Sequence, residues 1–93
     1  MEVNELFEKH NEEFLKFDRV EQKLSSRPDI HAFLLLDTLF PGNADIVCSA
    51  LHDQIYLDVS QDQIDELTEG NVIDLLRCGI LYDQDSDSLF SFV

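Results

Sequence analysis

The spacing of the apolar residues changes along this chain, and the change limits which elements the chain can form. From Val3 to Leu24 the apolar residues recur at steps of three, four or seven, whereas from Ile46 to Val59 they alternate with polar residues. The first pattern is typical of amphipathic helices and the second of half-buried strands. The sequence therefore predicts an α+β fold in which two N-terminal helices precede a small sheet.

Residues 1–27 are expected to form one long amphipathic helix. Its apolar stripe lies within residues 3–24 and consists of Val3, Phe7, His10, Phe14, Phe17 and Leu24. The opposite face carries charged side chains, among them Glu12, Glu13, Lys16, Arg19 and Lys23. We expect the aromatic residues of the stripe to be core residues, and His10 to be packed and hydrogen-bonded.

The second helix is expected to span residues 28–40. Ser26 and Asp29 have the spacing of a capping box, and Pro28 suits the first turn because its missing N–H has no partner there anyway. Pro41 and Gly42 end the helix. Its apolar residues cover most of its circumference, so this helix is predicted to be the central buried one.

The rest of the chain reads as two hairpins separated by short helices. The first hairpin covers residues 46–59, with its turn at His52 and Asp53. Ser60 is expected to cap a short helix, and Gly79 to close a second one.

We expect Gly70 and Asn71 to break the chain between these two short helices. Residues 80–82 and 88–93 are predicted to pair around a turn at 84–87. Both hairpins would form one antiparallel sheet, with helices on one face and Tyr56 and Asp58 on the other. The whole chain, 1–93, is predicted to be a single domain.

Negative charge is unevenly distributed. The net charge is −14; residues 1–27 hold seven acids and five bases, which gives −2, and residues 28–93 hold thirteen acids and one base, Arg77, which gives −12. Such a surface attracts basic partners over long distances. The alternative interpretation is that the charge only keeps the chain soluble. With 44% hydrophobic residues, the chain is too apolar for a disordered acidic tail.

These observations favour a non-catalytic acidic binding protein, with a basic surface of a nucleic-acid-binding protein as its partner. In charge and size the chain is similar to small acidic inhibitors, often phage-encoded, that imitate nucleic acid. A duplex about 30 Å long carries about 18 phosphate charges, the same order as the charge here. The acids predicted to contact the partner are Asp45, Asp53, Asp58, Asp62, Asp65, Glu66, Glu69, Asp83, Asp85 and Asp87.

Two other kinds of function remain open. A structural or assembly protein could self-associate through the seam of Phe7, His10, Phe14 and Phe17, or through an open sheet edge. A calcium-binding module is the other, because the acids of residues 83–88 resemble the start of an EF-hand loop. That loop lacks the glycine at its sixth position and the glutamate at its twelfth, so an Asp-rich hairpin turn is the favoured interpretation.

Catalytic and metal-binding signatures are weak. Cys48, His52 and Asp53 are neighbours, and Cys78 and His31 could approach them, but no paired ligand spacing occurs. We expect both cysteines to be buried free thiols rather than ligands or nucleophiles. There is no glycine-rich phosphate loop and only six bases. The sequence predicts no enzyme activity, no metal, no cofactor and no direct nucleic-acid binding.

Location follows from similar observations. The N-terminus carries no signal-peptide pattern, and the longest apolar stretch, residues 32–36, is too short to span a bilayer. Two cysteines are few for a disulfide-stabilised chain of this size. We therefore expect a reducing, cytoplasmic location and no membrane contact.

Overall fold

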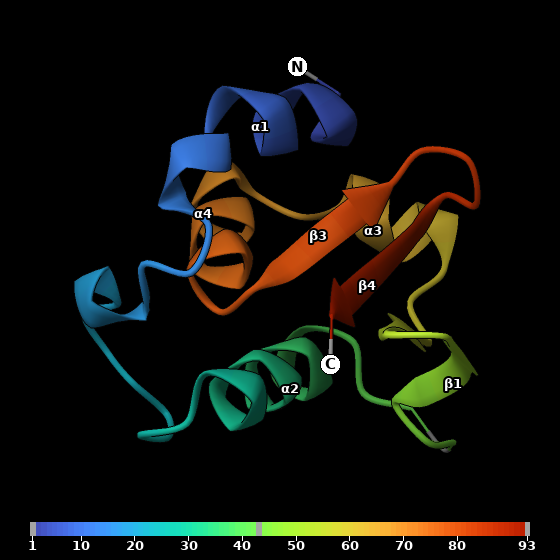
Figure 1. Ribbon diagram of the computed structural model, residues 1–93, viewed down its shortest axis with the longest axis horizontal. Helices are drawn as coiled ribbons and strands as arrows, with labels where there is room; N and C mark the ends of the chain where they lie inside the picture. The colour runs from blue at the N-terminus through green and yellow to red at the C-terminus, as the bar shows by residue number, and fades with distance from the viewer. Residues whose placement is uncertain (1, 43, 93) are drawn as a thin grey trace.

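The computed structural model describes residues 2–42 and 44–92 and has an α+β fold (Figure 1). Its helices are α1 (Val3–Lys9), α2 (Pro28–Leu39), α3 (Gln61–Asp65) and α4 (Glu69–Arg77). Its strands are β1 (Val47–Leu51), β2 (Gln54–Leu57), β3 (Ile80–Asp83) and β4 (Ser88–Phe92). Met1 and Val93, expected at the ends of the first helix and the last hairpin, lie outside the described residues.

The strands form one antiparallel sheet in the order β1-β2-β4-β3. Leu51 pairs with Gln54, so the predicted turn at His52 and Asp53 is confirmed. The second predicted hairpin is confirmed as well, because Asp83 pairs with Ser88 around residues 84–87. The two hairpins join through β2 and β4, where Tyr56 lies opposite Phe90.

The inner face of the sheet packs against the helices. Leu57, Ile80 and Leu89 are almost fully buried and belong to one cluster with Leu75 and Leu76 of α4. α4 is therefore the most completely buried helix, not residues 28–40 as predicted. Along α2, Ala32 and Leu36 are buried, but Ile30 and Leu34 are more than 40% exposed (41% and 43%), because α2 covers only one side of this core.

The single long helix predicted for residues 1–27 is wrong. α1 ends at Lys9, and the chain continues through two short 3₁₀ turns, Asn11–Glu13 and Phe17–Arg19. Leu15 adopts a left-handed conformation (φ 63), which no α-helix accommodates, and its N–H donates to the carbonyl oxygen of Leu76. The bends let successive apolar side chains reach the core from a chain that wraps around α4.

The short helices begin at capping side chains. Ser60 caps α3 as predicted, and its hydroxyl accepts a hydrogen bond from the N–H of Gln63. The predicted break at Gly70 and Asn71 is wrong, since both lie inside α4. Thr68 caps this helix in a capping box with Asn71, so the break falls one turn earlier. Gly79 closes α4 in a left-handed conformation (φ 90), as predicted.

The start of α2 differs from the prediction in its cap. Arg27, not Ser26, precedes the first helical residue, and no side chain caps this end. Pro28 takes the first position, as expected, since the ring fixes a helical φ and needs no hydrogen-bond partner.

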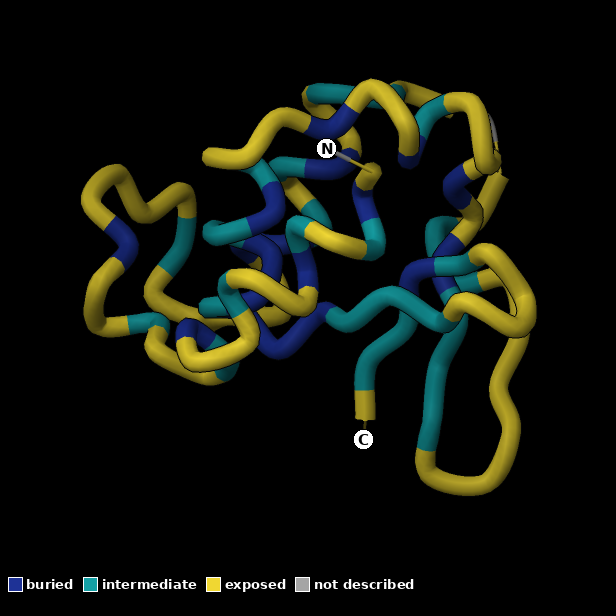
Figure 2. The backbone as a smooth tube through the Cα atoms, turned by 90° about the horizontal axis from the view of Figure 1, so that it is seen from above, coloured by how far each residue is buried: buried dark blue, intermediate teal, exposed yellow. Residues whose placement is uncertain are grey.

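The described chain has nearly equal dimensions, 29 × 28 × 26 Å. The β1–β2 hairpin projects from the body, and residues 48–53 are exposed along its outer edge (Figure 2). Among the described residues, no helix is long and apolar enough to cross a membrane.

Candidate acidic binding surface

The ten acids predicted to bind a partner all reach the surface. Asp83 is half-buried, and the other nine are exposed. Among the described residues, Glu69 is the only one of the ten that forms an ion pair. The structure distributes the remaining nine over two clusters and two single positions.

The larger group, here called the Tyr82 acidic cluster, lies where the β3–β4 turn approaches α3 (Figure 1). The Tyr82 hydroxyl donates a hydrogen bond to Asp87 Oδ1 at 2.8 Å, and the negative charge of Asp65 also acts on this hydroxyl. Burial, the hydrogen bond to Asp87 and these negative charges together raise the pKa of Tyr82. The members of the cluster are Asp65, Asp83, Asp85 and Asp87, together with Asp62, which lies three residues before Asp65 on α3 and so on the same side of that helix.

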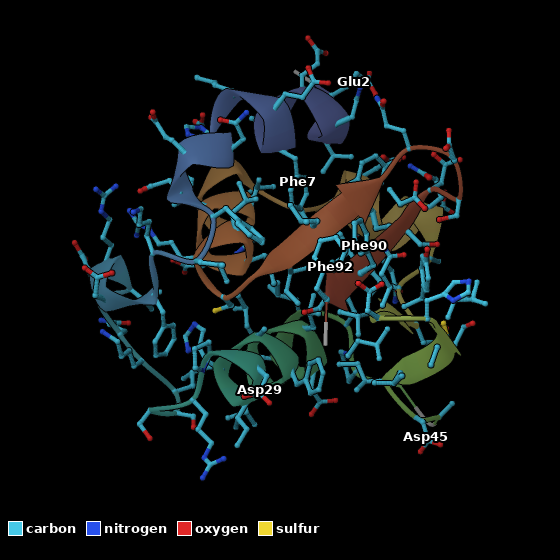
Figure 3. The ribbon with its side chains drawn as sticks, viewed as in Figure 1. Glu2, Phe7, Asp29, Asp45, Phe90 and Phe92 are labelled. Atoms are coloured by element: carbon cyan, nitrogen blue, oxygen red, sulfur yellow. The ribbon has the colours of Figure 1, made fainter. Side chains whose placement is uncertain are left out.

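A smaller group, the Asp45 acidic cluster, lies where α2 ends near the start of β1 (Figure 3). Asp45 and Asp58 line one shallow hollow with Asp37 of α2. The backbone brings them together, because the N–H of Asp58 donates to the carbonyl oxygen of Ile46 at 2.7 Å. Asp37 was missing from the predicted set, and its helical position gave no signal of this neighbourhood.

Three predicted acids belong to neither cluster. Asp53 is at the tip of the β1–β2 turn, and Glu66 is the C-cap of α3. Glu69 is paired with α1: its Oε2 lies 3.1 Å from Lys9 Nζ and 2.6 Å from His10 Nε2. These contacts lower the pKa of Glu69, mainly through the hydrogen bond to His10. Its charge is largely compensated, so Glu69 is a poor candidate for partner binding.

Sequence reasoning missed one charged centre, Glu13. It was expected on the solvent face of a long helix, but it is 8% exposed and its carboxylate contacts both Arg19 (2.6 Å) and Arg77 (3.2 Å). The hydrogen bond to Arg19, followed by the contacts with Arg77, lowers its pKa despite the opposing effect of burial. Arg77 therefore compensates Glu13 and does not contact the outward acids of the two clusters in the described chain.

The Asp-rich turn uses its side chains to hold itself in shape. Asp83 accepts hydrogen bonds from the N–H of Asp85 and the hydroxyl of Ser86, at 3.0 and 2.9 Å. The favoured interpretation, a hairpin turn, is confirmed by the strand pairing. Within the described residues, no group of three or more His, Cys, Asp or Glu side chains could hold a metal ion.

The cysteines and histidines weighed as ligands lie in different surroundings. Cys78 is buried as predicted, and burial raises its pKa to about 12. Cys48 is exposed, contrary to expectation, because β1 is an edge strand. His31 is buried at the start of α2, where its Nδ1 accepts a hydrogen bond from the N–H of Leu24.

The seam proposed for self-association is directed mainly at the chain's own core. Phe7 is buried and stacks on Tyr82 with ring centroids 5.9 Å apart, while Phe14 and Phe17 pack against the core from its edge. His10 contacts Glu69, as its predicted hydrogen-bonded role requires. The seam is therefore only partly available for self-association, since His10, Phe14 and Phe17 are half-buried, and the assembly hypothesis also keeps the two edge strands of the sheet, β1 and β3.

Comparison of the chain with known protein families, curated proteins and solved structures finds no match.

Proposed function

We propose that this chain is a non-catalytic binding protein whose acidic side occupies a basic, nucleic-acid-binding surface of another protein. The observation that carries the proposal is the separation of charges. Nine of the ten predicted acids lie outside ion pairs in the described chain and on segments that carry no base except Arg77, whereas the acids of residues 2–27 share their segment with five bases.

The arrangement of the chain supports this separation. The bases lie on residues 9–27 and at Arg77, which contacts Glu13 and the backbone of Arg19. In Figure 1 residues 11–27 lie on the left, whereas the β1–β2 hairpin and the β3–β4 turn lie on the right. An approaching basic surface would therefore meet uncompensated carboxylates on one side of the molecule, and attraction would speed its association.

A reducing, cytoplasmic setting belongs to the same proposal. Cys48 and Cys78 are both free thiols. Nucleic-acid-binding partners would be present in such a compartment. The specific form of the proposal that we favour is a phage-type inhibitor that imitates nucleic acid.

The experiment is capture of partners from an extract of the source organism on the immobilised chain, at low and high salt. An acidic-side variant replaces four exposed acids: Asp45→Asn, Asp62→Asn, Asp65→Asn and Asp85→Asn. A matched control variant changes the net charge equally on the N-terminal segment: Glu8→Gln, Glu12→Gln, Asp18→Asn and Glu21→Gln.

We expect the acidic-side variant to bind the captured protein at least about tenfold more weakly than the control variant does. Binding should also weaken with salt, because the attraction between exposed charges is screened. Equal binding by the two variants, or binding that does not depend on salt, would refute the proposal. Circular dichroism of both variants establishes that the fold is intact.

A second candidate function is self-assembly through the edge of β1. Residues 48–51 of this strand are exposed, and the outer edge of β1 has no neighbouring strand in the described chain. Sedimentation at two concentrations tests it: a concentration-dependent shift that a proline at Ala50, whose N–H faces away from β2, abolishes would support assembly, whereas a constant value for a single chain would exclude it.

A further inference from the structure

The outer face of the sheet carries aromatic residues where a solvated face would carry polar ones. Because side chains alternate along a strand, Tyr56, Phe90 and Phe92 share this face, opposite the buried Leu57 and Leu89. The ring centroids of Tyr56 and Phe90 are 5.9 Å apart, and those of Phe90 and Phe92 are 5.5 Å apart. The three rings form a continuous aromatic strip. Phe90 and Phe92, which lie on β4, are labelled in Figure 3.

This aromatic strip is not part of the core. None of its three residues belongs to the buried cluster or to the side chains packed against that cluster. Phe92 is 50% exposed, and Leu51, which continues the face beyond Gln54, is 58% exposed. Apolar side chains gathered on one exposed face are common where a protein contacts another molecule.

Acids border the strip. A hollow of about 360 Å³ lies over Phe90 and is lined by Gln54 from β2, by Asp83 at the end of β3 and by Asp85 from the β3–β4 turn. These two carboxylates belong to the Tyr82 acidic cluster, so the aromatic strip and the largest group of unpaired acids meet at this hollow. A partner seated here would contact rings and carboxylates together.

Charge decides between the possible occupants. A second copy of the chain would bring another net charge of −14 and would place the same carboxylates beside their own kind, which opposes association. A basic surface complements the border, and apolar side chains complement the rings. Grooves that bind single-stranded nucleic acid combine both properties, since they pair basic side chains with exposed aromatic rings.

We propose that the strip of Tyr56, Phe90 and Phe92 is the anchor of the binding surface, and that its partner is a basic groove with exposed aromatic side chains. This inference rests on the proposed function and specifies the chemistry of its partner. The acids bring the partner in and set the salt dependence, whereas the rings at the centre slow its release. The rings thereby stand in for the unpaired bases of a nucleic acid, and the carboxylates for its phosphates.

Two synthetic peptides of equal length and charge test this division of roles. One alternates Lys with Gly, and the other alternates Lys with Trp. We expect both to bind in a salt-dependent way, and the Lys–Trp peptide to bind about tenfold more tightly, because each stacked ring adds affinity. The variant Phe90→Thr with Phe92→Thr should remove this tenfold difference and leave Lys–Gly binding unchanged.

A matched control carries Leu24→Thr and Leu34→Thr, two exposed apolar residues outside the sheet (54% and 43%). It should keep the full preference for the Lys–Trp peptide. Should the Phe variant fail to fold, chemical-shift mapping on the unaltered chain decides instead. Shifts centred on Tyr56, Phe90 and Phe92 support the anchor, and shifts centred elsewhere overturn it.

The outcomes separate the two proposals. If neither peptide binds, the proposed function itself fails. If both bind equally, the acidic surface stands and the aromatic anchor is refuted. Sedimentation of the chain alone tests whether a second copy of the chain occupies the strip. A dimer that dissociates in the variant Phe92→Thr would overturn the inference.

Discussion

Arg77 contacts Glu13, sixty-four residues earlier in the chain, with Nη2 of the guanidinium 3.2 Å from Oε2 of the carboxylate. Arg77 is the only base after residue 27. Its guanidinium also donates to the carbonyl oxygen of Arg19, so it ties the end of α4 to the wrapped N-terminal segment. This pairing leaves the acids of the β1–β2 and β3–β4 regions without a nearby base from their own part of the sequence.

The substitution Glu13→Gln should destabilise the chain at neutral pH. It removes the acceptor charge shared by Arg19 and Arg77, whereas Glu12→Gln, at an exposed neighbour, should have little effect. Thermal melting at neutral pH measures the difference. A Glu13→Gln chain that melts at the temperature of the Glu12→Gln chain would contradict the pairing.

Acid should reduce the advantage of the native Glu13. Its pKa in the folded chain is lowered from the ordinary 4.5, so its contribution to stability is complete above that value. The contribution is lost as the pH falls through the folded-state pKa, because the protonated carboxyl no longer pairs with arginine. The melting difference between the native chain and Glu13→Gln should therefore shrink in acid; a constant difference would contradict this assignment.

The two thiols should differ sharply in reactivity. Cys48 is exposed on β1, whereas Cys78 is buried with its pKa raised to about 12, first by burial and then by the charge of Asp74. A thiol reagent at neutral pH should modify Cys48 rapidly and Cys78 only after denaturation. The chain with Cys48→Ser should be almost unreactive while folded, and rapid modification of this variant would contradict the buried position of Cys78.

Thr68→Ala should cost about 1 kcal/mol of stability. The hydroxyl of Thr68 accepts the hydrogen bond from the N–H of Asn71 at the start of α4. Thr38→Ala is the matched control, because the hydroxyl of Thr38 only bonds back to the carbonyl oxygen of Leu34 within α2. Chemical denaturation measures the loss of stability in both variants. Equal losses would contradict a helix start at Thr68 and favour the break at Gly70 and Asn71 that the sequence pattern predicted.

Leu75→Ala on α4 should cost about 2–5 kcal/mol, since a fully buried leucine is replaced by a cavity. Leu34→Ala on α2 should cost far less, because that side chain is 43% exposed. Denaturant titration of both variants compares the two helices. A larger cost at Leu34 would restore the prediction that residues 28–40 form the central helix.

The sheet could be predicted because its signals are local. Alternation in residues 54–59 and the two-residue turn at His52 and Asp53 fix which residues pair, and Ser60 and Gly79 mark helix ends by their own chemistry. The first segment could not be predicted. Its apolar spacing suits a helix and it contains neither glycine nor proline, so the bend at Leu15 depends on a distant contact with Leu76.

The sequence indicated which acids of the candidate site are exposed, but not which of them form ion pairs. Exposure of Asp62 or Asp85 follows from their polar surroundings in the sequence. The compensation of Glu69 does not, because Lys9 and His10 lie sixty and fifty-nine residues away and meet Glu69 only after α1 docks on α4. The aromatic strip was missed for a similar reason: Phe90 and Phe92 look like core residues until the pairing with β2 assigns them to the outer face.

Competition between the chain and nucleic acid for the captured partner tests the central claim most directly. A labelled oligonucleotide bound to that partner is titrated with the chain, once in single-stranded and once in duplex form. We predict complete displacement of the oligonucleotide that the partner binds, with the acidic-side variant displacing it far less well. A complex that holds the partner, the chain and the oligonucleotide together would contradict the account.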